Sequence, residues 1–121
     1  MRLQVPTQFN PAQHPDIQID WQDGLFRVVF DAMASPCTLL LELDKARFQD
    51  AKNIAMLAAI ECWRIEQKFS RYQKNNLFSQ LHSKPGTWIK LDAETTRLLN
   101  FADQAWHLSE GLFDISSGIL R

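Results

Sequence analysis

Apolar residues between positions 45 and 72 recur at steps of three and four, which is the spacing of one face of an α-helix. The stripe consists of Phe48, Ala51, Ala55, Ala58, Cys62, Ile65 and Phe69. A flank of further apolar residues widens it: Ile54, Leu57, Ile60 and Trp63. Glycine and proline are absent from the run, and Asp44 precedes it as a suitable N-cap residue. The pattern predicts one long amphipathic helix against which the other segments pack.

The residues before this helix alternate with a period of two, which is typical of strands. One face of the first strand carries Phe26, Val28, Phe30 and Ala32, and one face of the second carries Cys37, Leu39, Leu41 and Leu43. Between them, Pro36 interrupts the pattern because proline cannot donate a backbone hydrogen bond to a strand ladder. We therefore predict an antiparallel hairpin that turns near Ser35.

The flanking regions complete the predicted fold. Residues 1–23 form a polar leader, which ends in a short edge strand around Ile17, Ile19 and Trp21. After the long helix, residues 77–81 form a helical turn capped by Asn76, and residues 88–91 form a short strand. Asp92 starts a second main helix, which ends near Gly111 and carries Leu98, Phe101, Ala102, Ala105 and Leu108. The fold class is α+β, with a small, mostly antiparallel sheet packed by two main helices over residues 24–121.

Length, composition and net charge narrow the possible classes of protein. The chain has 121 residues, 45% of them hydrophobic and 22% charged, which fits one ordinary globular domain. A formal net charge of −1 gives no field that would attract nucleic acid or an anionic membrane. No apolar run is long enough for a membrane span and no signal peptide is visible, so we expect a cytoplasmic protein. Cys37 and Cys62 fit core positions better than a disulfide.

Composition and periodicity by themselves indicate no reaction. The glycines at 24, 86, 111 and 118 are isolated, so no glycine-rich phosphate loop exists. The three histidines are not at metal-ligand spacing with one another or with a cysteine. No serine follows the pattern of a nucleophile elbow, which argues against acyl transfer.

Three segments nevertheless combine side chains that suit a flat ligand. Residues 32–35 close a strand around Met33, which is either a packed side chain beside a turn or a wall for a ring. Residues 69–72 place an aromatic side chain where the long helix ends, either as simple helix termination or as a ligand wall. Residues 111–114 turn sharply and present Asp114, either as part of a helix cap or against polar groups of a ligand.

Taken in order, these segments resemble the ApbE family of flavin transferases. The family motifs are of the types A-M-G-T, F-S-x-Y, S-x-L-x-x-L and G-x-F-D-x-T-x-G-P-L. The corresponding residues here are Ala32-Met33-Ala34-Ser35, Phe69-Ser70-Arg71-Tyr72, the segment 76–81 and the segment 111–120. The resemblance extends from Phe26 to Leu120. The sequence departs from the motifs at Ala34 and Ser35, which replace Gly-Thr, and at Ser116 and Ile119, which replace Thr and Pro.

The resemblance implies a magnesium-dependent transferase that moves FMN from FAD to a Ser or Thr hydroxyl of a target flavoprotein and releases AMP. The residues that match FAD contacts of the family are Met33, Tyr72, Leu112, Phe113 and Asp114. Family members are longer, and their Mg²⁺ ligands follow the G-x-F-D segment. We therefore expect this sequence to be the N-terminal portion of such an enzyme, inactive alone, with metal ligands beyond Arg121. Two alternatives are a non-catalytic flavin-nucleotide binding module and an α+β interaction domain.

Overall fold

The computed structural model describes residues 1–3 and 16–120, with the backbone alone for residues 118–120. Residues 4–15, which belong to the predicted polar leader, lie outside the described residues. The chain divides into two compact units, Met1–Pro85 and Gly86–Arg121. The first unit contains the sheet, and the second contains the last long helix.

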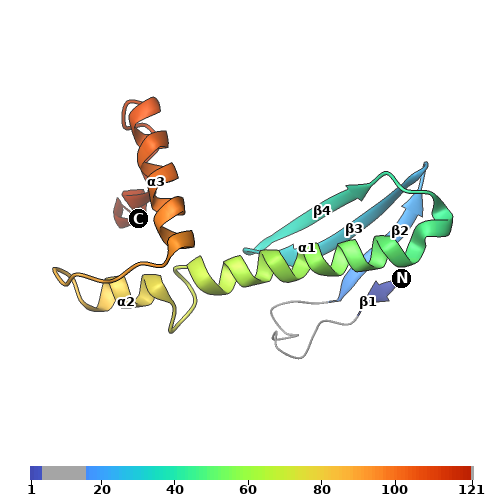
Figure 1. Cartoon of the computed structure of the whole chain (residues 1–121), viewed down its shortest axis with the longest axis horizontal. Coiled ribbons are helices and arrows are strands. Elements are labelled where there is room, and N and C mark those ends of the chain that lie inside the picture. The colour runs from blue at the N-terminus through green and yellow to red at the C-terminus, as the bar shows by residue number, and fades with distance from the viewer. Residues whose placement is uncertain (4–15, 121) are drawn as a thin grey trace. The chain divides into compact units, whose positions relative to one another are not determined.

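The sheet of the first unit has four antiparallel strands in the order β1-β2-β3-β4 (Figure 1). Their bounds are β1 Arg2–Leu3, β2 Ile17–Gln22, β3 Leu25–Ala32 and β4 Ser35–Leu41. The predicted α+β class and antiparallel sheet are confirmed. The short strand predicted around Ile17 exists, but β2 lies between β1 and β3 instead of at the edge. Its inner position arises because the first residues of the chain pair with it, and the backbone N–H of Ile19 donates to the backbone oxygen of Met1 at 2.9 Å.

One face of the sheet carries the core. The alternation predicted for β3 is confirmed, since Phe26, Val28, Phe30 and Ala32 are buried. Ile17 and Ile19 of β2 are also buried, and Cys37, Leu39 and Leu41 of β4 pack partly buried against this cluster. Leu43, predicted on the same strand, lies beyond the end of β4 but still packs against the core.

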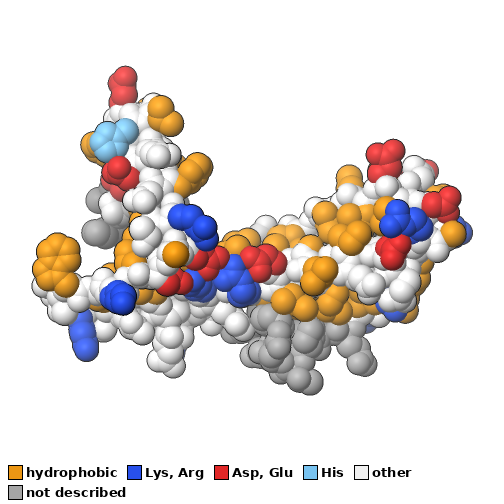
Figure 2. Space-filling view, in the orientation of Figure 1, with side chains coloured by type: hydrophobic (Ala, Val, Ile, Leu, Met, Phe, Trp, Pro, Cys, Tyr) orange, Lys and Arg blue, Asp and Glu red, His pale blue; other side chains and the backbone are white. Residues whose placement is uncertain are grey.

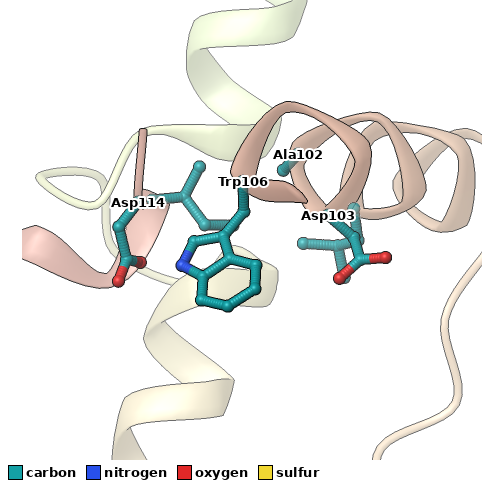
Figure 3. A pocket seen from close by; sticks show the side chains of 6 residues that line it. Ala102, Asp103, Trp106 and Asp114 are labelled. Atoms are coloured by element: carbon teal, nitrogen blue, oxygen red, sulfur yellow. The ribbon is translucent and has the colours of Figure 1, made fainter. Parts of the chain in front are cut away.

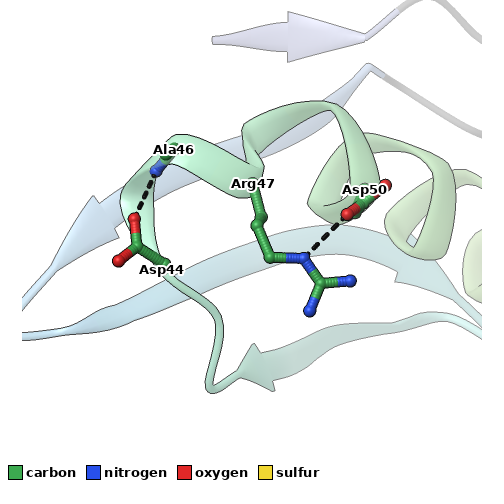
Figure 4. A network of polar contacts seen from close by, with 4 residues as sticks. All are labelled: Asp44, Ala46, Arg47 and Asp50. Carbon is green, nitrogen blue, oxygen red and sulfur yellow. Dashed lines mark hydrogen bonds and ion pairs between the residues drawn. The ribbon is translucent and has the colours of Figure 1, made fainter.

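The long helix α1, Phe48–Phe69, packs against this core through β2 and β3 (Figure 1). A 3₁₀ turn at Lys45–Arg47 precedes it, so the α-helix begins later than predicted and ends before Tyr72. Asp44, predicted as the cap of the long helix, caps this 3₁₀ turn instead, because its Oδ1 accepts a hydrogen bond from the Ala46 backbone N–H at 2.8 Å (Figure 4). The N-cap of α1 itself is Arg47, which makes no side-chain cap bond. In the next turn, the Arg47 guanidinium meets the Asp50 carboxylate at 2.8 Å.

The buried stripe of α1 differs from the predicted one. It consists of Ala51, Ala55, Ala59 and Trp63. These residues follow one i, i+4 row of the helix, which runs oblique to the helix axis. The predicted stripe, with its alternating steps of three and four, runs along the axis instead. Ala58 and Ile65 are therefore only half-buried, and Leu57, counted on the apolar flank, is 68% exposed. The three alanines have no side chain beyond Cβ, which lets the helix lie close to the sheet.

Trp63 is the largest fully buried side chain of the described residues. Its ring meets the Phe30 ring edge-on, with centroids 6.3 Å apart. The indole Nε1–H donates to the backbone oxygen of Asp31 at 2.7 Å, so the polar atom of the side chain is satisfied. Through these two contacts, Trp63 connects the second half of α1 to the end of β3.

The hairpin between β3 and β4 turns one position earlier than predicted. Its two central residues are Met33 and Ala34, with φ angles of +54° and +56°, and Ala32 pairs with Ser35 across the turn. Positive φ at both central residues defines a type I′ turn, which matches the twist of a two-residue hairpin. Pro36 does not interrupt the strand but lies inside β4, where an edge position tolerates a missing N–H group.

The second unit is built on α3, Ala93–Leu108, followed by a 3₁₀ segment at Ile115–Leu120. The predicted start is confirmed, because Asp92 Oδ1 accepts from the Thr95 backbone N–H at 3.0 Å. The strand predicted at residues 88–91 is wrong, since this segment has no regular structure and Trp88 is 100% exposed. A run of four residues cannot form a strand without a pairing partner. Figure 2 shows apolar side chains exposed along α3. Leu98, Phe101 and Leu108 of this helix are exposed.

Cys37 and Cys62 are both free and partly buried, and both pack against the core of the first unit. The core role predicted for them is confirmed. Burial raises the pKa of the Cys62 thiol, and the neighbouring Cys37 and Glu61 groups raise it further. Within residues 1–3 and 16–120, no helix combines the length and the apolarity needed to cross a membrane.

Candidate functional site

Met33 lies at the tip of the β3–β4 hairpin, and 55% of its surface is exposed. A left-handed conformation costs a residue with a Cβ atom about 1–2 kcal/mol, and the turn contains two such residues. The turn adopts it because the strands below are fixed, with Trp63 bonded to the Asp31 carbonyl just before the turn. Strain of this kind is common at ligand-binding sites. Met33 is therefore a flexible side chain on a rigid, strained support.

Replacing Ala34 with glycine should raise the free energy of unfolding by about 0.5–1 kcal/mol. Glycine removes the left-handed strain at this position, and its greater freedom in the unfolded chain cancels part of the gain. The measurement is the midpoint of urea unfolding. Ala32→Gly, in the buried strand beside the turn, is the matched control and should destabilise the protein. An Ala34→Gly variant less stable than the unmodified protein would contradict the strain argument.

The end of α1 is held by Asn76. After Phe69 the chain becomes extended at Ser70. The Asn76 side-chain amide donates to the backbone oxygens of Ser70 at 2.5 Å and Gln67 at 3.3 Å. Its Oδ1 accepts from the Ser79 backbone N–H at 3.0 Å and so caps α2, Leu77–Ser83. The predicted cap is confirmed, and the contacts of Asn76 to α1 are an additional role that the sequence did not reveal.

Tyr72 is displayed on this fixed loop, with 80% of its surface exposed. The Arg71 guanidinium stacks near the ring, with Cζ 4.8 Å from the ring centroid, and donates to the Tyr72 hydroxyl at 2.6 Å. Phe69 behaves differently, because its ring packs edge-on against Phe78 at 6.3 Å. Within this motif, Phe69 thus has a structural contact, and Tyr72 offers an aromatic surface to a ligand.

Met33 and Tyr72 belong to the same end of the first unit. The Met33 turn is tied to Trp63, and α1 continues from there only to Phe69. Six residues of α-helix span roughly 9 Å along the helix axis. Leu112, Phe113 and Asp114 lie in the second unit. Convergence of all five residues on one ligand stays a prediction.

The segment after α3 begins with a double left-handed turn. The backbone N–H of Gly111 donates to the Trp106 oxygen at 2.8 Å, and that of Glu110 to the His107 oxygen at 3.2 Å. This pair of bonds is a Schellman motif. Its first left-handed residue is Glu110 with φ of +53°, and Gly111 follows with φ of +82°. The predicted left-handed end of the helix is thus confirmed, but it begins one residue earlier, at Glu110.

The turn presents Leu112, Phe113 and Asp114 to the surface, and all three are exposed. The Phe113 backbone N–H is held by Ser109 Oγ at 2.8 Å. Asp114 Oδ1 accepts from the Ser116 hydroxyl at 2.6 Å and from the Ser116 backbone N–H at 2.8 Å. These bonds, the hydroxyl one first, lower the pKa of Asp114, so its carboxylate is ionised at neutral pH. The segment offers an anionic hydrogen-bond acceptor beside exposed apolar side chains.

A hollow of about 210 Å³ lies between α3 and this segment. Its lining residues are Leu99, Ala102, Asp103, Trp106, Asp114 and Ile115. Figure 3 shows the Trp106 indole standing between the Asp114 and Asp103 carboxylates. Asp114 was predicted as a site residue, and Trp106 and Asp103 were not. Leu99, Ala102 and Trp106 recur at helical spacing, but an ordinary helix surface has the same spacing, so no sequence signal singled out Trp106 or Asp103.

The described residues do not fit a magnesium site by themselves. Within residues 1–3 and 16–120, no group of three His, Cys, Asp or Glu side chains could hold a metal ion. The resemblance likewise implies metal ligands that follow the G-x-F-D segment.

The fold and the site together define an α+β protein that exposes an aromatic ring, a methionine and a carboxylate next to turns. The model of the ApbE family matches residues 33–121. The chain belongs to the ApbE family, as the motifs predicted, and the matched region contains all five predicted site residues. Membership associates the chain with flavin nucleotides and with flavin transfer at the level of the family. Comparisons with curated proteins and with solved structures find no match.

Proposed function

We propose that this protein takes part in the Mg²⁺-dependent transfer of FMN from FAD to a Ser or Thr hydroxyl of a target flavoprotein. The residues proposed to contact FAD are Met33, Tyr72, Leu112, Phe113 and Asp114. The observation that carries the proposal is the family match, which begins at Met33 and includes the other four residues.

The exposure of the apolar residues in this set supports a binding role. Met33 is 55% exposed, Tyr72 80% and Leu112 93%, so the protein core does not use them. Each Å² of apolar surface that a ligand removes from water contributes about 25 cal/mol. The isoalloxazine and adenine rings of FAD are flat, and aromatic rings and methionine suit such surfaces.

The polar residues of the proposed site suit the polar groups of FAD. Asp114 accepts hydrogen bonds at neutral pH, and adjacent backbone groups are held in place by Ser109. Cleavage of a pyrophosphate requires that the negative charge on the phosphoryl oxygens be neutralised, which a bound Mg²⁺ would do. We propose that the magnesium ligands lie outside the described residues. The residues of this chain bind and orient FAD.

Flavin transfer is tested with the full gene product, FAD, MgCl₂ and an apo flavoprotein that normally carries covalent FMN. After denaturing electrophoresis, the acceptor band should show flavin fluorescence, and it should stay dark with EDTA or with FMN in place of FAD. Tyr72→Ala and Asp114→Ala should each reduce the rate about tenfold, which corresponds to about 1.4 kcal/mol.

Trp88→Ala is the matched control, because Trp88 is fully exposed and lies outside the predicted contacts. Its rate should equal that of the unmodified protein. A dark acceptor band with FAD and Mg²⁺ present would contradict the proposal. FAD binding without transfer would favour the non-catalytic flavin-nucleotide module instead.

A further inference from the structure

An exposed apolar stripe follows one face of α3, next to the face that lines the hollow. The stripe consists of Leu98, Phe101, Ala105 and Leu108. At 3.6 residues per turn, their side chains fall within about 80° of arc around the helix axis. Leu98 is 42% exposed, Phe101 68% and Leu108 88%, and Ala105 is half-buried. A contiguous exposed apolar surface of this kind marks a site of association.

The spacing of the stripe is the same when it is read from either end of the helix. Its steps are three, four and three residues from Leu98 to Leu108. Alternating steps of three and four form the seam of a two-helix coiled coil. When two identical helices pair around a two-fold axis in antiparallel orientation, the first residue of each seam faces the last residue of the other. A seam with symmetric spacing therefore fits a second copy of itself, layer by layer.

The sizes of the side chains favour the antiparallel orientation. In that orientation, Leu98 of one copy faces Leu108 of the other, and Phe101 of one copy faces Ala105 of the other. A large ring opposite a methyl group fills the space between two helices evenly. Two parallel helices in register would instead place Phe101 against Phe101 and leave a gap between two Ala105 side chains.

Charge favours the same orientation. The two helix dipoles oppose each other in an antiparallel pair, so each helix end meets an end of opposite sign. Arg97 borders the stripe one residue before Leu98, and Glu110 follows two residues after Leu108, both with exposed side chains. Antiparallel pairing brings Arg97 of one copy to the end at which Glu110 of the other copy lies, whereas parallel pairing would bring two Arg97 side chains together.

We infer that α3 is a self-association surface and pairs in antiparallel orientation with α3 of a second copy of this chain. The inference goes beyond the proposed flavin transfer and does not depend on it. A helix of 16 residues is about 24 Å long, so contacts along it bury less surface than a permanent dimer requires. The dimer is therefore weak, with a dissociation constant on the order of 10 µM.

Sedimentation equilibrium of the full chain between about 1 and 500 µM tests the inference. The unmodified protein should pass from monomer to dimer over this range. Phe101→Glu places a charge in the middle of the seam, so it should raise the dissociation constant at least about tenfold. Leu40→Glu is the matched control, because Leu40 is 58% exposed in β4 and lies outside the second unit. It introduces the same charge and should leave the dissociation constant unchanged.

Two variants mixed with each other test the orientation. Leu98→Glu and Leu108→Lys, both at exposed positions, should each associate about tenfold more weakly than the unmodified protein. In an antiparallel pair with one copy of each, the new carboxylate faces the new ammonium group at one end, and two leucines face each other at the other end. An equimolar mixture should therefore recover association to within about threefold of the unmodified protein. A parallel pair would place each new charge opposite a leucine, without recovery.

Other results would overturn the inference. A monomer at every concentration would assign the stripe to a different protein or to another segment of the same polypeptide. A dimer that Phe101→Glu leaves intact would form through another surface. Absence of recovery in the mixture would exclude the antiparallel pair.

Discussion

Replacing Trp63 with alanine should lower the free energy of unfolding by about 3–5 kcal/mol, the usual range for a large aromatic residue removed from a core. Trp63 is fully buried and packs edge-on against Phe30. The variant leaves a cavity between α1 and β3, and it also removes the hydrogen-bond donor of the Asp31 backbone oxygen. Both losses act on the hairpin that carries Met33.

Urea unfolding followed by circular dichroism measures this loss. Trp63→Phe keeps most of the ring volume and removes the hydrogen bond, so it should cost about 1–3 kcal/mol and separate the two contributions. Trp88→Ala, a change of the same chemistry at a fully exposed position, should stay within about 0.5 kcal/mol. A loss below about 1 kcal/mol in Trp63→Ala would show that this tryptophan does not hold α1 to the sheet.

Asn76→Ala should lower the free energy of unfolding by about 2 kcal/mol. The substitution removes the cap of α2, worth about 1 kcal/mol. It also removes the donor to the Ser70 and Gln67 oxygens, worth a further 1 kcal/mol or so. Amide hydrogen exchange over residues 70–79 should accelerate, because the loop that carries Tyr72 loses its central contact.

Asn76→Asp separates the two roles of this residue. Aspartate keeps the acceptor for the Ser79 N–H and loses both donated bonds, so its stability should lie between those of Asn76→Ala and the unmodified protein. Asn75→Gly is the matched control, because Asn75 has a φ of +63° that glycine adopts freely. Unchanged exchange rates in Asn76→Ala would refute a bracing role for Asn76.

The sequence predicted those features that depend on neighbouring residues. Asp44, Asn76 and Asp92 were all predicted as helix caps, and each accepts a backbone N–H two or three residues ahead. Capping is local chemistry, so the sequence is sufficient to find it. The alternation in β3 was also predicted from the sequence, because a strand with one buried face carries an apolar side chain at every second position.

Features that depend on tertiary contact were less accessible. The buried row of α1 follows the direction in which the sheet crosses the helix, and the hydrophobic pattern alone does not contain that direction. The turn at Met33 and Ala34 lacks the Asn and Gly residues that normally announce positive φ, while Ser35 and Pro36 have the composition of a turn.

The five FAD contacts stay a prediction. The five proposed FAD contacts came from motifs, and the structure places each of them at the surface next to a turn. Trp106 and Asp103 were missed because they line a hollow that exists only after the segment following Gly111 folds back beside α3. Neither residue stands in a motif, and their spacing alone fits an ordinary helix surface.

Pro36 has one more effect, on association between molecules. Ala32 and Ser35 flank a two-residue turn and exchange hydrogen bonds, so the next pair, Asp31 and Pro36, is a non-hydrogen-bonded one. The nitrogen of Pro36 therefore points away from β3, toward the free side of β4. A strand of another molecule that approached this edge would find no backbone N–H donor at Pro36. Edge-to-edge pairing between sheets of different molecules is therefore interrupted at this position.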